Sequence, residues 1–426
     1  MQSRADFSLL FCLLLSATLS QAFAIRASAA EKVLYRFGGG KDGAYPSSNL
    51  VFDASGNLYG TTSRGGNTTN CTLGCGVVFE LSPSGNGKWQ QKVIYAFKGG
   101  QDGLEPMGNL IFDAEGNLYG TTYGGGATTS CTAVPGCGTV FELTPRGGGW
   151  KEAVLYSFQD GSDGALPVSL AMDASGNLYG ATISGGIEFG TVFELMPRQK
   201  GGWKEKTVYS FQAFEIQADP GFVFDAAGNL YGSWFQLYAC NRACGTVFEI
   251  KNPGKNPQEV DLYDFTGGGN GGEPMAGVTL DNKGNVYGTG AEGGNNWGIA
   301  FELKHSGDRW KEIMLYNFCS LNDCDDGANP LAPLVFDQAG NLYGTAEGGG
   351  TGCAFNASCG VVFKLSRARF GWKETVLHDF KGEPDGSSPT QGLTLDGKGN
   401  IYGTTALGGK GGNSGYGTVF EVATHR

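Results

Sequence analysis

The sequence predicts an all-β fold: a closed seven-bladed β-propeller with four antiparallel strands in each blade. Three observations support this fold, namely the glycine-rich composition, three short phrases that recur in register, and the unequal ends of the repeat array. Glycine accounts for 74 of the 426 residues, a share that disfavours long helices. Hydrophobic residues make up 40% and aromatic residues 12% of the chain, so the chain can bury a large core.

Internal repeats dominate the sequence. The phrase Asp-x-x-Gly-Asn-Leu-Tyr-Gly recurs seven times, with its Asn at positions 57, 117, 177, 229, 285, 341 and 400. A second phrase, similar to Gly-Thr-Val-Phe-Glu-Leu, starts at positions 76, 138, 190, 245, 298, 360 and 417. A third phrase, similar to Val-Leu-Tyr-Ser-Phe, ends at Phe37, Phe97, Phe158, Phe211, Phe265, Phe318 and Phe380. Seven copies of each phrase predict seven structural repeats.

Each repeat contains four strand-like segments rich in Val, Leu, Phe, Tyr and Thr. In the second repeat these segments are Asn109–Asp113, Asn117–Thr122, Thr139–Leu143 and Ala153–Phe158. Between the first two lies a tight turn in which Gly116 is free to adopt a positive φ. Strands with mostly apolar sides need a cover on both faces of their sheet, and a ring of sheets provides it without long exposed edges.

The two ends of the repeat array complement each other. The segment Lys32–Phe37 is an isolated copy of the third phrase, whereas the seventh repeat ends at Val422 and lacks that phrase. We therefore expect the N-terminal strand to complete the last blade. This exchange requires the two ends to meet, so it predicts a closed ring rather than an open array.

The order of the phrases resembles a known family. Units of Asn-Leu-Tyr-Gly-Thr-Thr-x-x-Gly-Gly followed by Gly-Thr-Val-Phe-Glu-Leu, and preceded by Asp-Gly-x-x-Pro, resemble the GloVer-type tandem repeat of exported bacterial proteins with varied (choice-of-anchor) ends. The resemblance covers residues 31–422. More distantly, the units are similar to NHL-like β-propellers, although the Asn-x-Arg that often follows there is absent here. The resemblance implies a propeller and an exported location, and it implies no established chemistry.

Residues 1–29 have the features of a cleavable secretory signal peptide. Arg4 precedes the apolar run Phe7–Leu15, and the motifs Ala22-Phe23-Ala24 and Ala27-Ser28-Ala29 follow with small residues at the positions that a signal peptidase requires. We therefore expect residues 30–426 to form a single domain that is secreted, or held in the periplasm or at the cell surface. No other stretch approaches the roughly 20 apolar residues that span a bilayer, so no membrane span is expected in the mature chain.

The cysteines outside this signal, which contains Cys12, fall into five close pairs. The pairs are Cys71 and Cys75, Cys131 and Cys137, Cys240 and Cys244, Cys319 and Cys324, and Cys353 and Cys359. An even number of locally paired cysteines in an exported chain predicts disulfides. A zinc site built from two of these pairs is the alternative. We favour five local disulfides, because most pairs stand at corresponding places of the repeat.

Charge and composition exclude several function classes. The formal net charge is −11 and no long basic run occurs, so nucleic acid is not an expected partner. Only His305, His378 and His425 are present, and we predict neither a metal site nor a cofactor. The Asp residues of the inter-blade links are expected to form turns before Pro, with a cation at the channel mouth as the alternative; they are Asp42, Asp102, Asp163, Asp326 and Asp385.

Blade four departs most from the repeat, and both departures are expected on the face that carries the long loops. There Thr-Thr-x-x-Gly-Gly is replaced by an aromatic segment, and the preceding link loses its Gly-Gly. Aromatic side chains beside carboxylates suit a sugar ring or an apolar peptide. The predicted ligand-binding residues are Glu188, Phe189, Phe214, Glu215, Trp234, Phe235, Tyr238 and Trp297. The alternative is that these side chains only fill the gap left by shorter loops.

These features favour an exported, monomeric, non-catalytic binding module for an unidentified glycan or protein ligand. No nucleophile elbow, zinc-type His cluster or phosphate loop occurs in the sequence, and no catalytic residue is predicted. A carbohydrate-active or lyase-like propeller enzyme is the alternative, with Glu188 and Glu215 flanking the bond to be cleaved. A passive structural surface protein is the third possibility.

Overall fold

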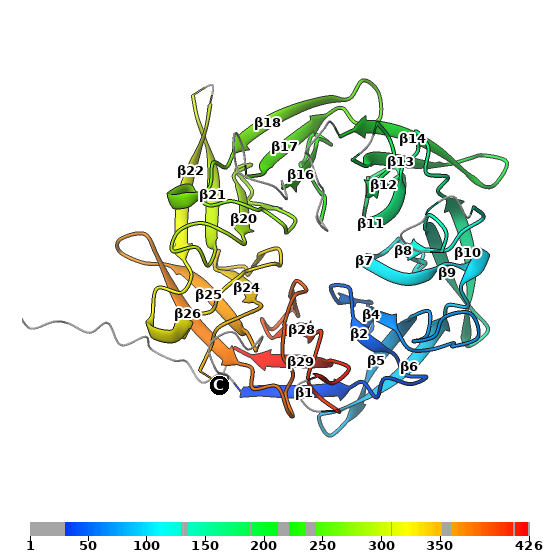
Figure 1. Ribbon diagram of the computed structural model, residues 1–426, viewed down its shortest axis with the longest axis horizontal. Helices are drawn as coiled ribbons and strands as arrows, with labels where there is room; N and C mark the ends of the chain where they lie inside the picture. Colours follow the sequence, from blue (N-terminus) through cyan, green and yellow to red (C-terminus); the bar gives the residue numbers. More distant parts are fainter. Residues whose placement is uncertain are drawn as a thin grey trace, which may run out of the picture.

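The computed structural model describes residues 30–128, 131, 135–187, 189–211, 221–235, 244–307, 309–351, 359–411 and 414–424. Within these residues the strands form seven antiparallel sheets in a ring about a central axis (Figure 1). Each sheet contains four strands, and the first sheet carries one short additional strand. The all-β, seven-bladed propeller expected from the sequence is therefore confirmed.

The first four blades follow one another in chain order, each with its last strand at the rim (Figure 1). Blade one comprises β2 (Ala44–Pro46), β3 (Val51–Phe52), β4 (Leu58–Arg64), β5 (Val77–Gly85) and β6 (Lys88–Ala96). Blade two comprises β7 (Leu104–Phe112), β8 (Leu118–Gly124), β9 (Thr139–Arg146) and β10 (Gly149–Ser157). Blade three comprises β11 (Ala165–Met172), β12 (Leu178–Ser184), β13 (Thr191–Pro197) and β14 (Trp203–Ser210), and blade four β15 (Val223–Phe224), β16 (Leu230–Trp234), β17 (Thr246–Lys251) and β18 (Gln258–Asp264).

The remaining blades repeat this order. Blade five comprises β19 (Thr279–Leu280), β20 (Val286–Gly290), β21 (Ile299–Ser306) and β22 (Arg309–Asn317), and blade six β23 (Val335–Phe336), β24 (Leu342–Ala346), β25 (Val361–Arg367) and β26 (Trp372–Asp379). Blade seven comprises β27 (Thr394–Leu395), β28 (Ile401–Thr405), β29 (Thr418–Ala423) and the N-terminal strand β1 (Ala30–Arg36). Short 3-10 turns lie at Gly100–Asp102, Gly268–Asn270 and Asn322–Cys324. In the part of the chain that the structure describes, no helix has the length and apolar character needed to cross a membrane.

The ring closes through the N-terminal strand, as the sequence predicts. Strand β1 pairs antiparallel with β29, with Lys32 opposite Glu421 and Arg36 opposite Thr418. Figure 1 shows this blue strand beside the red one. The ammonium of Lys32 lies 3.8 Å from the carboxylate of Glu421. The last blade thus takes its outer strand from the beginning of the chain.

The core consists of seven clusters of buried residues, one between each pair of adjacent blades. At the centre of each cluster, the Phe that ends the third phrase meets the Phe of the second phrase in the next blade. These fully buried pairs are Phe37–Phe79, Phe97–Phe141, Phe158–Phe193, Phe211–Phe248, Phe265–Phe301, Phe318–Phe363 and Phe380–Phe420. Their ring centroids are 4.9 to 6.0 Å apart, a separation typical of edge-to-face aromatic contacts.

The Gly of Asn-Leu-Tyr-Gly makes room for one ring of each pair. Gly120 of β8 stands opposite Phe141 of β9 in the sheet register. A Cβ atom on Gly120 would lie 2.5 Å from the Cζ atom of Phe141, which is closer than packed carbon atoms tolerate. The glycine is therefore required by the aromatic contact, and this requirement links the first phrase to the second.

The turn between the first two strands of a blade is held by its Asp. In blade two, the carboxylate of Asp113 accepts hydrogen bonds from the backbone N–H and the side-chain amide of Asn117, each at 2.8 Å. The Tyr119 hydroxyl donates to the same carboxylate at 3.0 Å, and Gly116 has a φ of 84°. The predicted tight turn is confirmed. The preceding strand differs from the prediction, because β7 begins already at Leu104.

Local disulfides lie on the face that carries the long loops. Cys71–Cys75, Cys131–Cys137 and Cys319–Cys324 are bonded as predicted. Cys244 and Cys359 are also disulfide-bonded, while their predicted partners Cys240 and Cys353 lie outside the described residues. Such bonds form in oxidising compartments, which indicates folding outside a reducing cytosol.

The central axis is narrow. The backbone N–H of Gly392 in blade seven donates a hydrogen bond to the Asn49 side chain of blade one at 2.5 Å. A Cβ atom on Gly277 would lie 2.3 Å from the backbone nitrogen of Gly221. The cavity that Asn49, Asn109, Gly221 and Gly392 help to line has a volume of about 80 Å³. This space holds a few water molecules rather than a ligand of the size of a sugar.

Replacing Gly120 by Ala tests the aromatic contact. We expect G120A to lower the free energy of unfolding by about 1–3 kcal/mol, because the new methyl group forces the buried Phe141 ring out of its position. Thermal or denaturant unfolding measures this change. The control is G397A, because Gly397 is exposed and a Cβ there meets no atom within 4 Å; its effect should stay within about 0.5 kcal/mol. Equal stability of the two variants would contradict the role assigned to Gly120.

Candidate functional site

The structure describes half of the ligand-binding residues predicted from the sequence. Glu188, Phe214, Glu215 and Tyr238 lie outside the described residues. Phe189, Trp234 and Trp297 are half-buried, and Phe235 is buried. The carboxylates expected to accompany the aromatic rings are therefore not placed by the structure.

Two of the described aromatic residues come together at the interface of blades three and four. Trp234, the last residue of β16, stands opposite Thr246 in the sheet register. Trp234 and Phe189 pack against one buried cluster, which includes Phe211 and Phe222. Trp297 belongs to the loop before β21, and its carbonyl oxygen accepts a hydrogen bond from the Asn329 N–H at 2.8 Å. Packing on a hydrophobic cluster agrees with a gap-filling role for Trp234 and Phe189, and their role in binding remains a prediction.

A groove of about 480 Å³ opens between the outer strands of blades four and five. Strand β18 and the end of β17 form one wall, and the β21–β22 hairpin forms the other. In the hairpin, His305 and Trp310 stand opposite each other in register, and their ring centroids are 4.3 Å apart. The lining residues are Glu249, Lys251, Val260, Asp261, Leu262, Tyr263, Asp264, His305, Arg309 and Trp310.

The groove carries charges of both signs. Lys251 and Arg309 supply positive charge, while Glu249, Asp261 and Asp264 supply negative charge. The Lys251 ammonium lies 3.7 Å from the carboxylate of Glu249. Apart from the buried Glu249, these charged side chains are exposed. A ligand in the groove therefore meets hydrogen-bond donors and acceptors next to an aromatic ring.

A departure from the repeat accompanies this groove. In blades one to three a Pro stands opposite the hairpin Trp, as Pro145 does opposite Trp150. The Trp in those blades packs edge-on against a Tyr of the preceding blade, with centroids 5.9 to 6.2 Å apart. In blade five the Pro is replaced by His305, whose ring packs against Trp310 at an interplanar angle of 54°. This site is not evident from the sequence because Trp310 stands at a repeated position, although the exchange of Pro for His at position 305 is visible there.

Four of the five Asp residues of the inter-blade links act as turn formers that bond to a tyrosine. The carboxylate of Asp163 accepts hydrogen bonds from the Gln159 N–H and the Tyr156 hydroxyl, each at 2.9 Å. Asp42, Asp102 and Asp326 make the corresponding contacts with a backbone N–H and a Tyr on the outer strand of the preceding blade. Their carboxylates therefore bond to the outer strands, which supports the expected turn-forming role over the alternative of a cation at the channel mouth.

A Glu from the next blade adds to several of these Tyr–Asp pairs. The Tyr95 hydroxyl lies 3.5 Å from the carboxylate of Glu152 in addition to its bond with Asp102. Burial, reinforced by the charge of Asp102, raises the pKa of Glu152 to about 7. Burial and the charge of Asp163 similarly raise the pKa of Glu205 to about 7. A raised carboxyl pKa can mark a catalytic acid, but recurrence at several interfaces indicates a feature of the scaffold.

The sequence of this chain matches the model of a known repeat family. The Gloeobacter/Verrucomicrobia repeat matches residues 21–188, 72–267 and 224–426. The chain belongs to this family. This match confirms the resemblance to the GloVer-type repeat that the three recurring phrases indicate. No curated protein is significantly similar to this chain in sequence.

Two solved structures show similarity to this chain at low sequence identity. A protein of unknown function from Dyadobacter fermentans shares 13% identity and a TM-score of 0.48, over 94% of this chain and 98% of that chain. A luciferin-regenerating enzyme shares 13% identity and a TM-score of 0.44, over 74% of this chain and 90% of that chain. At these values neither likeness carries a functional argument.

The contact of Trp234 with the buried cluster predicts a loss of stability on truncation. We expect W234A to lower the free energy of unfolding of this repeat protein by about 1–3 kcal/mol, because a half-buried indole loses its packing. Denaturant unfolding of the variant measures the loss. F370A is the control, because Phe370 is 84% exposed and its truncation should cost less than about 0.5 kcal/mol. If W234A unfolds like F370A, the packing role of Trp234 is wrong.

Proposed function

We propose that the protein is an exported, non-catalytic binding module that recognises a neutral glycan through the groove between blades four and five. The groove itself carries this proposal, because it combines an accessible volume with an aromatic ring and paired charges. Ligand sites typically unite an apolar wall with a few polar groups that fix orientation.

The chemistry of the groove suits a sugar better than a charged polymer. The apolar face of a sugar ring packs on an aromatic side chain such as Trp310. The sugar hydroxyls find donors on Arg309 and Lys251 and acceptors on Asp261 and Asp264. Because positive and negative side chains alternate around the groove, a polyanion or a polycation meets repulsion as well as attraction.

Several observations support export and binding rather than catalysis. Disulfides on the loop face support an oxidising compartment, and the proposed signal peptide of residues 1–29 lies outside the described residues. The pKa values of Glu152 and Glu205 are raised in clusters that recur between blades. This recurrence indicates a feature of the scaffold rather than a catalytic acid. The alternative is a carbohydrate-active or lyase-like enzyme, and the release of a cleaved product would identify it.

The aromatic residues in and beside blade four are proposed as a second contact for the same ligand class on the loop face. Trp234, Phe189 and Trp297 each keep part of their surface exposed. Trp234 and Phe189 pack on a buried cluster, as Trp310 does. This proposal ranks below the groove because the groove adds an accessible volume and charged side chains beside its aromatic ring.

Glycan-array binding followed by titration with the best ligand tests the groove. We expect W310A to weaken binding at least about tenfold, because an aromatic anchor at the centre of a site contributes most of its affinity. The matched control is W89A, which truncates the Trp at the same repeat position in blade one and should leave the affinity unchanged. Retained affinity in W310A with lost affinity in the W234A/W297A double variant would overturn the groove and place the site on the loop face.

A further inference from the structure

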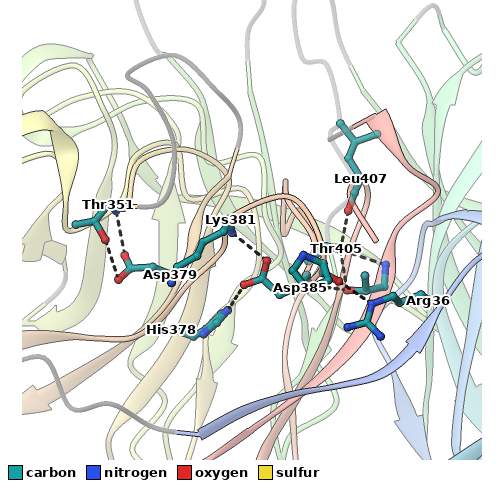
Figure 2. Close-up of polar contacts among 10 residues, drawn as sticks. Arg36, Thr351, His378, Asp379, Lys381, Asp385, Thr405 and Leu407 are labelled. Atoms are coloured by element: carbon teal, nitrogen blue, oxygen red, sulfur yellow. Dashed lines mark hydrogen bonds and ion pairs between the residues drawn. The ribbon is translucent and has the colours of Figure 1, made fainter. Parts of the chain in front are cut away.

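Three side chains from separate segments meet where the ring closes. Glu31 lies on β1, His378 on β26, and Asp385 in the link between blades six and seven. Their potential ligand atoms all lie within 4.8 Å of one another. The Nε2 atom of His378 is 3.1 Å from the Oδ2 atom of Asp385, and the Lys381 N–H donates to Oδ1 of the same carboxylate at 3.1 Å (Figure 2).

His378 breaks the repeat at this position. The residue two places before the terminal Phe of the third phrase is a tyrosine in the other six copies, namely Tyr35, Tyr95, Tyr156, Tyr209, Tyr263 and Tyr316. A phenol is sufficient to bond the Asp of the link, as Tyr35 does with Asp42 and Tyr316 with Asp326. The hydrogen bond to Asp385 therefore does not explain a histidine. What the histidine adds is an imidazole nitrogen that can coordinate a metal ion.

Glu31 has a buried oxygen without a partner. Its Oε1 atom is inaccessible to solvent and accepts no hydrogen bond, and such an atom is costly to bury. Burial raises the pKa of Glu31 to about 7, with His378 opposing and Asp385 reinforcing the change. Glu152, Glu312 and Glu374, on the outer strands of other blades, also have such an oxygen. The blade before each of these three has a tyrosine, namely Tyr95, Tyr263 or Tyr316, where the blade before Glu31 has His378. Only the cluster at the closure joins two carboxylates to an imidazole in the described residues.

We propose that Glu31, His378 and Asp385 bind a divalent transition-metal ion, with zinc as the expected ion. One nitrogen and two carboxylate oxygens form a ligand set that zinc accepts, whereas calcium and magnesium prefer oxygen ligands alone. At zinc–ligand distances of about 2.0 Å, two ligands of a tetrahedral site are about 3.3 Å apart. The 3.1 Å between His378 and Asp385 fits this requirement with little rearrangement.

The surroundings orient the ligands and leave access for the ion. The His378 ring packs edge-on against Phe380 with centroids 4.7 Å apart, and the Lys381 N–H holds the Asp385 carboxylate, as outer contacts of metal ligands commonly do. The side chains of His378 and Asp385 are 14% and 11% exposed. Arg36 donates from Nε to the Pro384 carbonyl at 2.8 Å, and its charge near Glu31 opposes a cation, so the affinity should be moderate.

The other cluster of possible ligands in the described residues does not form such a site. Cys131, Cys137 and Asp160 lie equally close together, but the two sulfur atoms are joined in a disulfide and provide no thiolate. The closure cluster differs because none of its three groups is held in a covalent bond, and a metal ion can replace the hydrogen bond between His378 and Asp385. A bound ion would connect β1 directly to blade six and to the link, in addition to the backbone pairing of β1 with β29.

Titration of the oxidised mature protein, residues 30–426, with zinc chloride tests the proposal. Calorimetry should show one zinc ion per chain, and zinc should raise the melting temperature by several degrees, with reversal by a chelator. H378Y restores the residue of the other six blades, so it should fold normally and lose this site. E31Q should weaken zinc binding at least tenfold, whereas E152Q, which changes the corresponding residue of blade two, should leave it unchanged.

Three outcomes would contradict the proposal. Zinc binding that is unchanged in both H378Y and E31Q would show that the ion binds elsewhere on the chain. No binding to the parent protein would exclude the site. Stabilisation by calcium but not by zinc, if it depends on Glu31, would exclude the transition-metal assignment. If H378Y folds poorly, E31Q and E152Q still provide the comparison.

Discussion

Each blade is held to the next by the contact of two buried phenylalanines, and the rest of the fold depends on this contact. One ring ends the outer strand of a blade, the other lies on the third strand of the following blade, and the glycine opposite makes space for it, as Phe97, Phe141 and Gly120 do. Because the contact is made between blades, a single repeat cannot satisfy it alone. The seventh contact, Phe37 with Phe79, exists only when the N-terminal strand closes the ring.

Because the blades repeat one set of contacts, the positions at which a blade departs from the repeat are informative. Tyr and Asp join adjacent blades at the rim, and Pro stands opposite the hairpin Trp in three blades. His305 and His378 replace the Pro and the Tyr at one place each. The two rings pack against Trp310 and Phe380, and each lies beside the groups that we propose as a ligand site, for a sugar at the groove and for a metal ion at the closure.

The sequence predicts the fold well because the fold is repeated. Seven copies of the phrases give the blade number, and the isolated segment Lys32–Phe37 gives the closure. The site is less predictable, since the groove unites β18 of one blade with the hairpin of the next, and such neighbours are not evident from either repeat alone. Trp234 was recognised as a departure, but whether a departing aromatic side chain faces a ligand or the core depends on packing. The structure places it against Phe211 and Phe222.

Deleting the N-terminal strand tests the central claim, that the blade contacts are complete only in a closed ring. A chain of residues 38–426 loses the Phe37–Phe79 contact and exposes the edge of β29. Thermal unfolding combined with size-exclusion chromatography should show a lower melting temperature and self-association, and a synthetic peptide of residues 30–37 should partly reverse both. A truncated protein that remains monomeric, with the melting temperature of the parent, would contradict the account.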